Sequence, residues 1–228
     1  MSTVKVKICG ITQDEDVRMV CELGADAIGF VVGVPSSPRN LSVERAKSLF
    51  KLVSTHIKRV LVTVPQRSGE VLKFYEYLKP DAIQIHGEEI EDLHELKKEL
   101  SEVILIRALS MKSKDTILEV AIQEAKSFDA ILVDSFAFGK YGGSGKIHDW
   151  SISKRIRDAI YPKPLILAGG LTPENVREAI QTVMPYAVDV STGVELRPGV
   201  KDYQKVKSFI NNAKGVVLNG YSNYPELW

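Results

Sequence analysis

Short apolar runs alternate with amphipathic helical segments along most of the sequence, and this alternation constrains the fold more than any other feature. Eight such runs occur, and their starts are spaced by about 25 residues, the length of one strand–turn–helix unit. The runs are continuous rather than alternating, which is typical of parallel strands buried on both faces. We expect the strands at residues 5–9, 27–32, 59–64, 82–86, 103–107, 130–134, 165–168 and 187–191.

Eight strand–helix units close into a barrel, so the sequence predicts an α/β fold, a single (βα)8 TIM barrel with eight parallel strands. A doubly wound sheet is the alternative, but it usually has fewer strands and a switch point in strand order, which nothing in the sequence marks. The barrel is expected over residues 1–213 of the 228. Residues 214–228 lie outside the pattern and could pack on the outside, mediate self-association or be disordered.

Three helix starts are marked by capping residues. Thr12 and Glu15 form the pattern of a capping box before the first helix. Ser42 is expected to cap the second helix. Thr172 is expected to cap the seventh helix, with Pro173 at its first position.

Composition argues against several classes of function. The net charge is +1 and the basic residues form no stripe, so no nucleic-acid partner is expected. No apolar run approaches the roughly 20 residues of a membrane helix, and no secretory signal precedes the first strand. We therefore expect a cytoplasmic protein with no membrane partner. Cys9 and Cys21 are expected as free thiols, because about nine residues of helix place them roughly 13 Å apart, beyond the reach of a disulfide.

Two glycine-containing loops suggest a phosphate site at the carboxyl ends of the strands, where barrels form their active sites. Gly169 and Gly170 close the seventh strand, and Ser191, Thr192 and Gly193 close the eighth. In many barrels these two loops hold a phosphate, because backbone N–H groups donate to it and glycine allows close approach. The alternative is that the glycines only turn tight corners.

A thiol and a carboxyl group are expected at the same end of the barrel. Cys9 ends the first strand beside the phosphate loops, whose dipoles could lower the pKa of the thiol and let a thiolate abstract a proton. Asp134 ends the sixth strand, three steps away around the ring, and could act as the acid. The structural alternatives are an apolar filler for Cys9 and a loop cap or partner of Lys140 for Asp134.

Other polar residues near the strand ends have less specific roles. Arg39 lies in a Ser/Pro loop and either binds a substrate carboxylate or is a solvated charge. His86 with Glu88 could suggest a metal pair, but beyond Cys9 no further His or Cys ends a strand, so no metal is expected. His86 is instead expected in a supporting hydrogen bond, and Asp189 is expected to orient the neighbouring backbone.

Several motifs in the same order resemble the phosphoribosylanthranilate isomerases of tryptophan biosynthesis. The resemblance runs in register from about residue 4 to residue 213. The matching segments are KICGIT at 7–12, QIHGE at 84–88, YGGSGK at 141–146, LAGGL at 167–171, PENV at 173–176 and VDVSTGVE at 188–195.

This resemblance implies an Amadori rearrangement of N-(5-phosphoribosyl)anthranilate without cofactor or metal. By similarity, Asp134 is the general acid that opens the furanose ring, and Cys9 is the general base that removes the proton from C2′. Arg39 lies near the anthranilate carboxylate, and the two glycine loops bind the phosphate. Family members occur as monomers and homodimers.

The resemblance and the glycine content also suggest a loop that orders over the bound substrate. This loop follows the sixth strand and contains Gly142, Gly143, Ser144 and Gly145.

Two other functions remain as alternatives. One is another phosphosugar barrel, such as the histidine-pathway isomerase or indole-glycerol-phosphate synthase. As families, the first uses two aspartates and the second a lysine and a glutamate, and Cys9 with Asp134 fits neither. The other is a barrel that binds a phosphorylated metabolite without catalysis, which would not need a thiol and a carboxyl group facing each other.

Overall fold

Eight parallel strands close into a ring within residues 2–88, 90–111, 116–135, 149–218 and 224–228, which the computed structural model describes. The ring closes because β2 pairs with both β3 and β10. The predicted TIM barrel is confirmed. In ring order the strands are β2 (Lys5–Cys9), β3 (Ala27–Val32), β5 (Lys58–Thr63), β6 (Ala82–Ile85), β7 (Ile104–Ser110), β8 (Ala130–Asp134), β9 (Leu165–Leu167) and β10 (Ala187–Val190).

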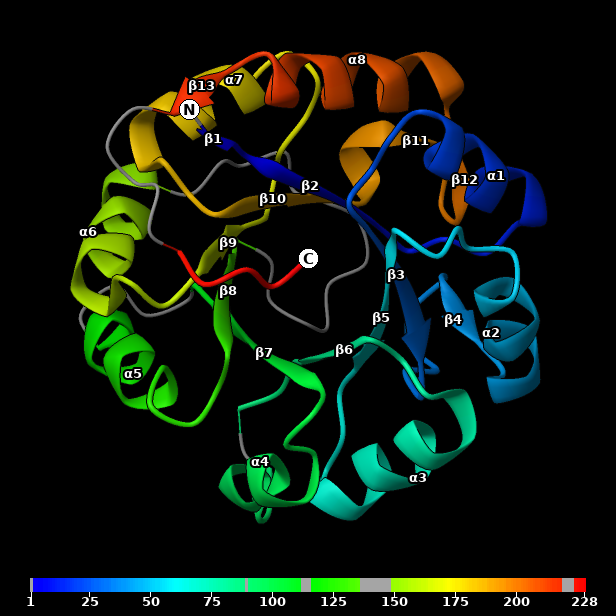
Figure 1. Ribbon diagram of the computed structural model, residues 1–228, viewed down its shortest axis with the longest axis vertical. Coiled ribbons are helices and arrows are strands. Elements are labelled where there is room, and N and C mark those ends of the chain that lie inside the picture. The colour runs from blue at the N-terminus through cyan, green and yellow to red at the C-terminus, as the bar shows by residue number, and fades with distance from the viewer. Residues whose placement is uncertain (1, 89, 112–115, 136–148, 219–223) are drawn as a thin grey trace.

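Helices surround this ring and bury their apolar faces against it (Figure 1). They are α1 (Asp14–Glu22), α2 (Val43–Phe50), α3 (Ser68–Leu78), α4 (Leu96–Glu99) after the 3-10 turn η1 (Leu93–Glu95), α5 (Ile117–Glu124), α6 (Trp150–Ile160), α7 (Val176–Val183) and α8 (Tyr203–Lys214). Short strands add to the loops: β4 (Asn40–Leu41) and the hairpin of β11 (Glu195–Arg197) with β12 (Val200–Lys201). Among the described residues, none of these helices is long and apolar enough to span a bilayer.

The predicted caps of the first two helices have different outcomes. Ser42 caps α2 as predicted, because its side chain accepts a hydrogen bond from the Arg45 amide. The capping box before α1 is wrong: Gln13 is the N-cap residue and makes no side-chain capping bond. The hydroxyl of Thr12 instead donates to the carbonyl of Gly199 at 2.5 Å. A tertiary contact therefore takes the group that the local sequence assigns to the helix.

The start of α7 also differs from the prediction. The helix begins at Val176, three residues after Pro173, and its N-cap residue is Asn175 rather than Thr172. The side chain of Asn175 accepts a hydrogen bond from the Thr172 amide at 2.8 Å, which forms a local turn before the helix. The strands deviate little from their predicted bounds, except that β7 extends to Ser110.

The barrel interior begins with a layer of small side chains. Alternate strands contribute to each layer of a TIM barrel. Here the strands in every second place of the ring, β3, β6, β8 and β10, each begin with a fully buried alanine. From one of these strands to the next the register advances by two residues, which places the alanines in one layer. They are Ala27, Ala82, Ala130 and Ala187.

The C-terminal tail fills the space below this alanine layer. Its strand β13 (Val217–Leu218) pairs antiparallel with β1 (Ser2–Thr3). Leu227 and Trp228 are buried in the same apolar cluster as the four alanines, and the chain ends at the centre of the ring (Figure 1). The hydroxyl of Tyr186 accepts from the amides of Leu227 and Trp228 at 3.0 and 3.1 Å and donates to the Trp228 carbonyl at 3.3 Å. The described tail residues therefore pack into the barrel end, although the domain boundary expected at residue 213 stays a prediction.

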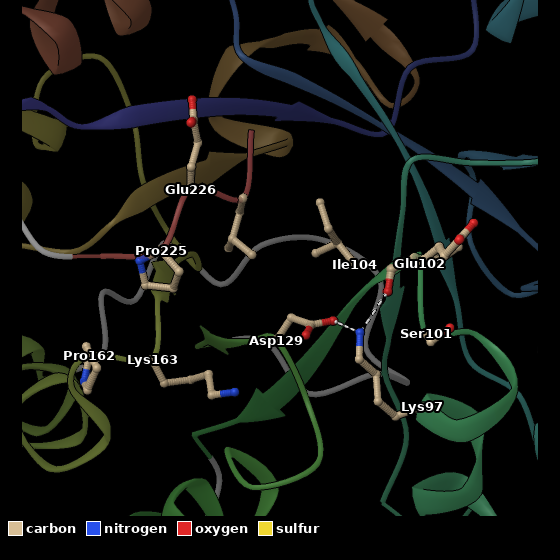
Figure 2. A pocket seen from close by; sticks show the side chains of 11 residues that line it. Lys97, Ser101, Glu102, Ile104, Asp129, Pro162, Lys163, Pro225 and Glu226 are labelled. Atoms are coloured by element: carbon tan, nitrogen blue, oxygen red, sulfur yellow. Dashed lines mark hydrogen bonds and ion pairs between the residues drawn. The ribbon is translucent and has the colours of Figure 1, made fainter.

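A pocket of about 510 Å³ remains beside the tail (Figure 2). Figure 2 shows Pro225 and Glu226 of the tail along one side of it, and Lys97 and Asp129 across from them. The ammonium of Lys97 pairs with the carboxylate of Asp129 at 2.6 Å. Asp129 immediately precedes β8, so this pocket lies at the amino-terminal end of the strands, opposite the expected active site.

Replacing Trp228 with alanine should destabilise the fold by about 3 kcal/mol, because the change removes a large buried side chain from the space below the alanine layer. Equilibrium urea unfolding measures this difference. Glu226→Ala is the matched control, since Glu226 lies exposed in the same tail, and it should change the free energy of unfolding by less than about 0.5 kcal/mol. Equal stability of Trp228→Ala and the unmodified protein would show that the tail does not hold the barrel.

Candidate active site

The upper layers of the barrel interior combine polar side chains with apolar ones, in contrast to the alanine layer at its base. By register, Lys7 lies in the layer directly above the alanines, Gly29 and Asp189 lie in the next layer, and Cys9 lies above them. Asp134 ends β8 one layer higher still. The ring order places β8 three steps from β2. The predicted positions of Cys9 and Asp134 at the same end of the barrel are therefore confirmed.

Gly10 brings three of the predicted site residues together. It follows Cys9 and has a φ of +74°, a conformation that favours glycine. A Cβ atom on Gly10 would overlap Cδ of Arg39 and would lie 2.8 Å from the hydroxyl oxygen of Ser191. That hydroxyl is buried and has no hydrogen-bond partner among the described residues. Cys9, Arg39 and Ser191 thus border one space, with an unused hydroxyl group beside it.

The two predicted phosphate loops lie against each other. Gly169 and Gly170 follow β9 with φ values of +82° and +67°. Gly193 lies in the 3-10 turn η2 (Thr192–Val194) after β10, and a Cβ atom there would overlap the carbonyl oxygen of Leu171. These glycines therefore allow an approach of backbone to backbone that other residues would block.

Asp134 borders the loop after β9. Its carboxylate oxygen Oδ1 is 2.8 Å from the position that a Cβ atom on Gly169 would take. The Asp134 side chain is partly exposed, so it can face a bound molecule. The carboxyl group, the glycine loops and the thiol therefore follow one another around the mouth of the barrel.

Lys7 and Asp189 form an ion pair inside the barrel. The Lys7 side chain is fully buried, and its Nζ atom lies 2.9 Å from Oδ1 of Asp189. Burial lowers the pKa of Lys7, but the charges of Asp189 and Cys9 more than offset this, so the pKa lies above its usual value. Lys7 is therefore protonated at neutral pH. Asp189 binds this ammonium, whereas the sequence led us to expect that it orients the backbone.

A second charged group, formed by Glu195 and Lys201, lies behind Arg39. The Nε and Nη2 atoms of Arg39 donate to the two carboxylate oxygens of Glu195 at 2.7 and 2.5 Å. Nη2 is also 3.2 Å from the hydroxyl of Thr192, and buried Lys201 donates to Glu195 at 2.9 Å. The guanidinium fork predicted to bind a substrate carboxylate is thus held by a carboxylate of the protein. A substrate carboxylate can approach Nη1, which makes none of these bonds, or compete with Glu195.

The direction of the Cys9 pKa differs from the expectation. Burial, with 8% of the residue exposed, raises the pKa of the thiol above its usual value. The ammonium groups of Lys7 and Lys201 act in the opposite direction, and the carboxylate of Asp189 raises the pKa further. The lowering expected from loop dipoles is therefore wrong. The cations next to the thiol oppose the effect of burial without reversing it.

His86 is neutral in this structure. Burial and the nearby charges of Lys7 and Arg107 lower its pKa to about 3. Its Nε2 atom lies 2.7 Å from Nε2 of Gln84, which is the supporting hydrogen bond expected of it. In the described part of the chain, no three His, Cys, Asp or Glu side chains gather in a way that could hold a metal ion.

Some predicted residues lie outside the described ranges. They are Gly142, Gly143, Ser144 and Gly145 of the expected loop over the substrate, together with Lys140. Cys9 and Cys21 are free cysteines, as expected.

Three charged residues of the site were missed from the sequence. Lys7 interrupts an apolar strand two residues before Cys9, and this parity was a usable signal because alternate residues face the same side. Glu195 was noticed only as part of a motif. Lys201 gave no signal, because the short hairpin that brings it to Glu195 leaves no periodic pattern.

Comparison with known proteins shows which family shares this arrangement. A family model described as N-(5′-phosphoribosyl)anthranilate isomerase matches residues 6–212. The chain belongs to the phosphoribosylanthranilate isomerase family. The isomerase class and the place in tryptophan biosynthesis that the resemblance implied are thereby confirmed at the level of the family.

Individual members of the phosphoribosylanthranilate isomerase family match over nearly their whole length. The isomerase of Methanocaldococcus jannaschii is 42% identical over an alignment 224 residues long. The alignment covers 93% of this chain and 98% of that protein. A crystal structure of the isomerase from Thermotoga maritima has a TM-score of 0.81 at 41% identity and covers 93% of this chain and 100% of that one. Another, of an isomerase in complex with reduced 1-(o-carboxyphenylamino)-1-deoxyribulose 5-phosphate, has a TM-score of 0.77 at 39% identity, with the same coverage. The tail lies beyond the family match.

Replacing Glu195 with glutamine should destabilise the protein in a pH-dependent way. Burial raises the pKa of Glu195, but bonds to Arg39 and Lys201 outweigh it, so the pKa lies below its usual 4.5. A carboxyl group whose pKa is lowered by folding stabilises the fold at pH values above its pKa in the unfolded state. This stabilisation is lost as the pH falls through the pKa in the folded state. Urea unfolding should show a loss of about 3 kcal/mol near neutral pH, since Lys201 loses a buried partner. The loss should shrink below about pH 4.5. A pH-independent loss would contradict an ionised Glu195.

Proposed function

We propose that this chain isomerises N-(5′-phosphoribosyl)anthranilate by general acid–base catalysis, with Asp134 as the acid and Cys9 as the base. One observation supports this most directly: both groups end strands of one barrel mouth, three steps apart, with the glycine loops and Arg39 beside them. A substrate lying across this mouth would meet a carboxyl group on one side and a thiol on the other. That arrangement suits proton transfer at two places on one molecule.

The reaction needs two proton transfers at the sugar. The Asp134 carboxyl group gives its proton to the furanose ring oxygen, the bond from that oxygen to C1′ breaks, and the nitrogen lone pair forms a Schiff base. The Cys9 thiolate then takes the proton from C2′, and the electrons of that C–H bond form the enolamine. Tautomerisation gives 1-(2-carboxyphenylamino)-1-deoxyribulose 5-phosphate. Neither transfer calls for a redox group, because electrons move only within the substrate.

The loops after β9 and β10 are proposed to bind the phosphate. Gly169, Gly170 and Gly193 leave their backbone open to close approach, and Ser191 and Thr192 add hydroxyl groups. The Ser191 hydroxyl supports this proposal because it is buried without a partner among the described residues. An unpaired buried hydroxyl is costly, and a phosphate oxygen would pair with it.

Arg39 is proposed to bind the anthranilate carboxylate. Its contact with Gly10 places the guanidinium next to the strand end that bears Cys9. Glu195 fixes its orientation, which lowers the conformational entropy lost when a substrate binds. The partner is thus a phosphorylated small molecule. Assembly as a monomer or homodimer and a cytoplasmic location stay predictions.

Turnover of freshly generated N-(5′-phosphoribosyl)anthranilate tests these roles, followed by the loss of anthranilate-type fluorescence. Cys9→Ser and Asp134→Asn should each lower kcat by about 10²- to 10⁴-fold while a product analogue still binds, because each removes one proton transfer. Arg39→Ala should mainly raise KM.

Cys21→Ser is the matched control, since it removes the other free thiol, which lies on α1. It should leave turnover unchanged. An unmodified protein without turnover, or a Cys9→Ser variant with most of the rate, would contradict the assignment and favour another phosphosugar substrate or phosphate binding alone.

A further inference from the structure

The Lys7 side chain extends upward through the barrel interior toward Cys9. Lys7 lies two layers below Cys9 on the same strand, and Gly29 of β3 occupies the layer between them. A Cβ atom on Gly29 would lie 3.0 Å from Nζ of Lys7 and 2.7 Å from Sγ of Cys9. The ammonium and the sulfur therefore border the same small volume, which is open only because residue 29 has no side chain.

Asp189 fixes the position of the ammonium in this volume. It lies opposite Lys7 in the β10–β2 register, and its Oδ1 atom is 2.9 Å from Nζ. The same ammonium borders the sulfur of Cys9 at the position of Gly29 and favours the charged form of the thiol. A lysine has three N–H donors, so one ammonium can serve the carboxylate and the sulfur together. The result is a row of three groups across the barrel, Asp189, Lys7 and Cys9.

More cations than carboxylates act directly on Cys9. The cations are Lys7, Lys201 and Arg39, and the carboxylate is Asp189. Behind them, Glu195 pairs with Arg39 and Lys201, and Asp16 accepts a hydrogen bond from the Lys201 amide. His86 also faces Lys7 but is neutral. Buried charges are costly unless they are paired. A thiolate at Cys9 would interact favourably with these cations, whereas a neutral thiol would not.

We propose that Lys7, held in place by Asp189, is a positioning residue that stabilises the Cys9 thiolate from within the barrel. This inference rests on the proposed function of Cys9 as the base. In the step itself, the sulfur gains the proton from C2′ and Lys7 keeps its own protons. The ammonium then remains to favour return of the sulfur to the thiolate when the proton leaves.

The alternative is that Lys7 and Asp189 form an ion pair that only supports the fold. That role predicts a change in stability without a change in the titration of Cys9. The two roles therefore separate in a measurement on the sulfur itself.

The test is the ionisation of Cys9, followed by the ¹³Cβ chemical shift between about pH 7 and pH 12, because burial already raises the pKa of this thiol. A Cys21→Ser background leaves Cys9 as the single cysteine. In Lys7→Met the midpoint should rise by at least about one pH unit, a tenfold loss of thiolate at a given pH. Lys7→Arg keeps the charge and should restore part of the shift.

Lys5→Met is the matched control. Lys5 lies on the same strand, and its ammonium pairs with Asp26 at 3.5 Å rather than with groups near the sulfur. This variant should leave the midpoint in place. Equal midpoints in Lys7→Met and the unmodified protein would overturn the proposal, and so would an equal shift in Lys5→Met.

Lys7→Met leaves Asp189 buried without its cation and could fail to fold. The double variant Lys7→Met/Asp189→Asn removes both charges, and its midpoint should also rise, because Lys7 acts on Cys9 more strongly than Asp189 does. A reciprocal measurement leaves Lys7 and Asp189 intact. Since coupling between two sites is mutual, Cys9→Ser should lower the pKa of Lys7, read from its ¹⁵Nζ shift. An unchanged Lys7 titration would overturn the proposal.

The proposed function and this inference can fail separately. A shifted Cys9 midpoint in a protein that does not turn over the substrate would uphold the pairing of Lys7 with the thiolate and refute the activity. An active protein whose Cys9 midpoint is the same with and without the Lys7→Met change would refute the inference and leave the acid–base roles intact.

Discussion

Around the closed ring, the strand register shifts by two residues between alternate strands. The rest of the molecule depends on this constraint. Because the advance is regular, inward side chains form layers. The base layer is alanine, whereas the layers above it combine charged residues, such as Lys7 and Asp189, with apolar ones. A shift of one residue in any strand would turn its inward set outward. The layering therefore ties the chemistry to the fold.

Charges inside a barrel require complete pairing, since each isolated ion would lose several kcal/mol of hydration. Lys7 meets this condition through Asp189, and Lys201 meets it through Glu195, which also holds Arg39. The two groups meet at Cys9, where burial and the cations act on the thiol in opposite directions. The ionisation of a thiol buried beside charged groups thus depends on those groups, whereas a thiol in the alanine layer would have only burial acting on it.

The sequence reveals those parts of the structure that follow from the periodic pattern of apolar residues. Continuous apolar runs predicted the strands, and the residues that end them, such as Cys9 and Asp134, were placed at the mouth of the barrel without knowledge of side-chain contacts. Lys7 could have been found by the same parity argument. The pairing of Arg39 with Glu195 could not, because it joins residues 156 apart in sequence through two irregular loops. Thr12 shows the converse error, in which a local capping pattern loses to a contact with Gly199.

The tail shows how a segment outside the family match can still complete the family fold. Four alanines at the start of alternate strands leave the base of the barrel short of side-chain volume, and protein interiors do not tolerate such voids cheaply. Trp228 and Leu227 supply that volume from the opposite end of the sequence. The two ends of the barrel then differ in kind, because large apolar side chains close the base while charged and small residues form the mouth. Stability and chemistry are thereby separated along one axis, which allows the base to change without moving the groups around Cys9.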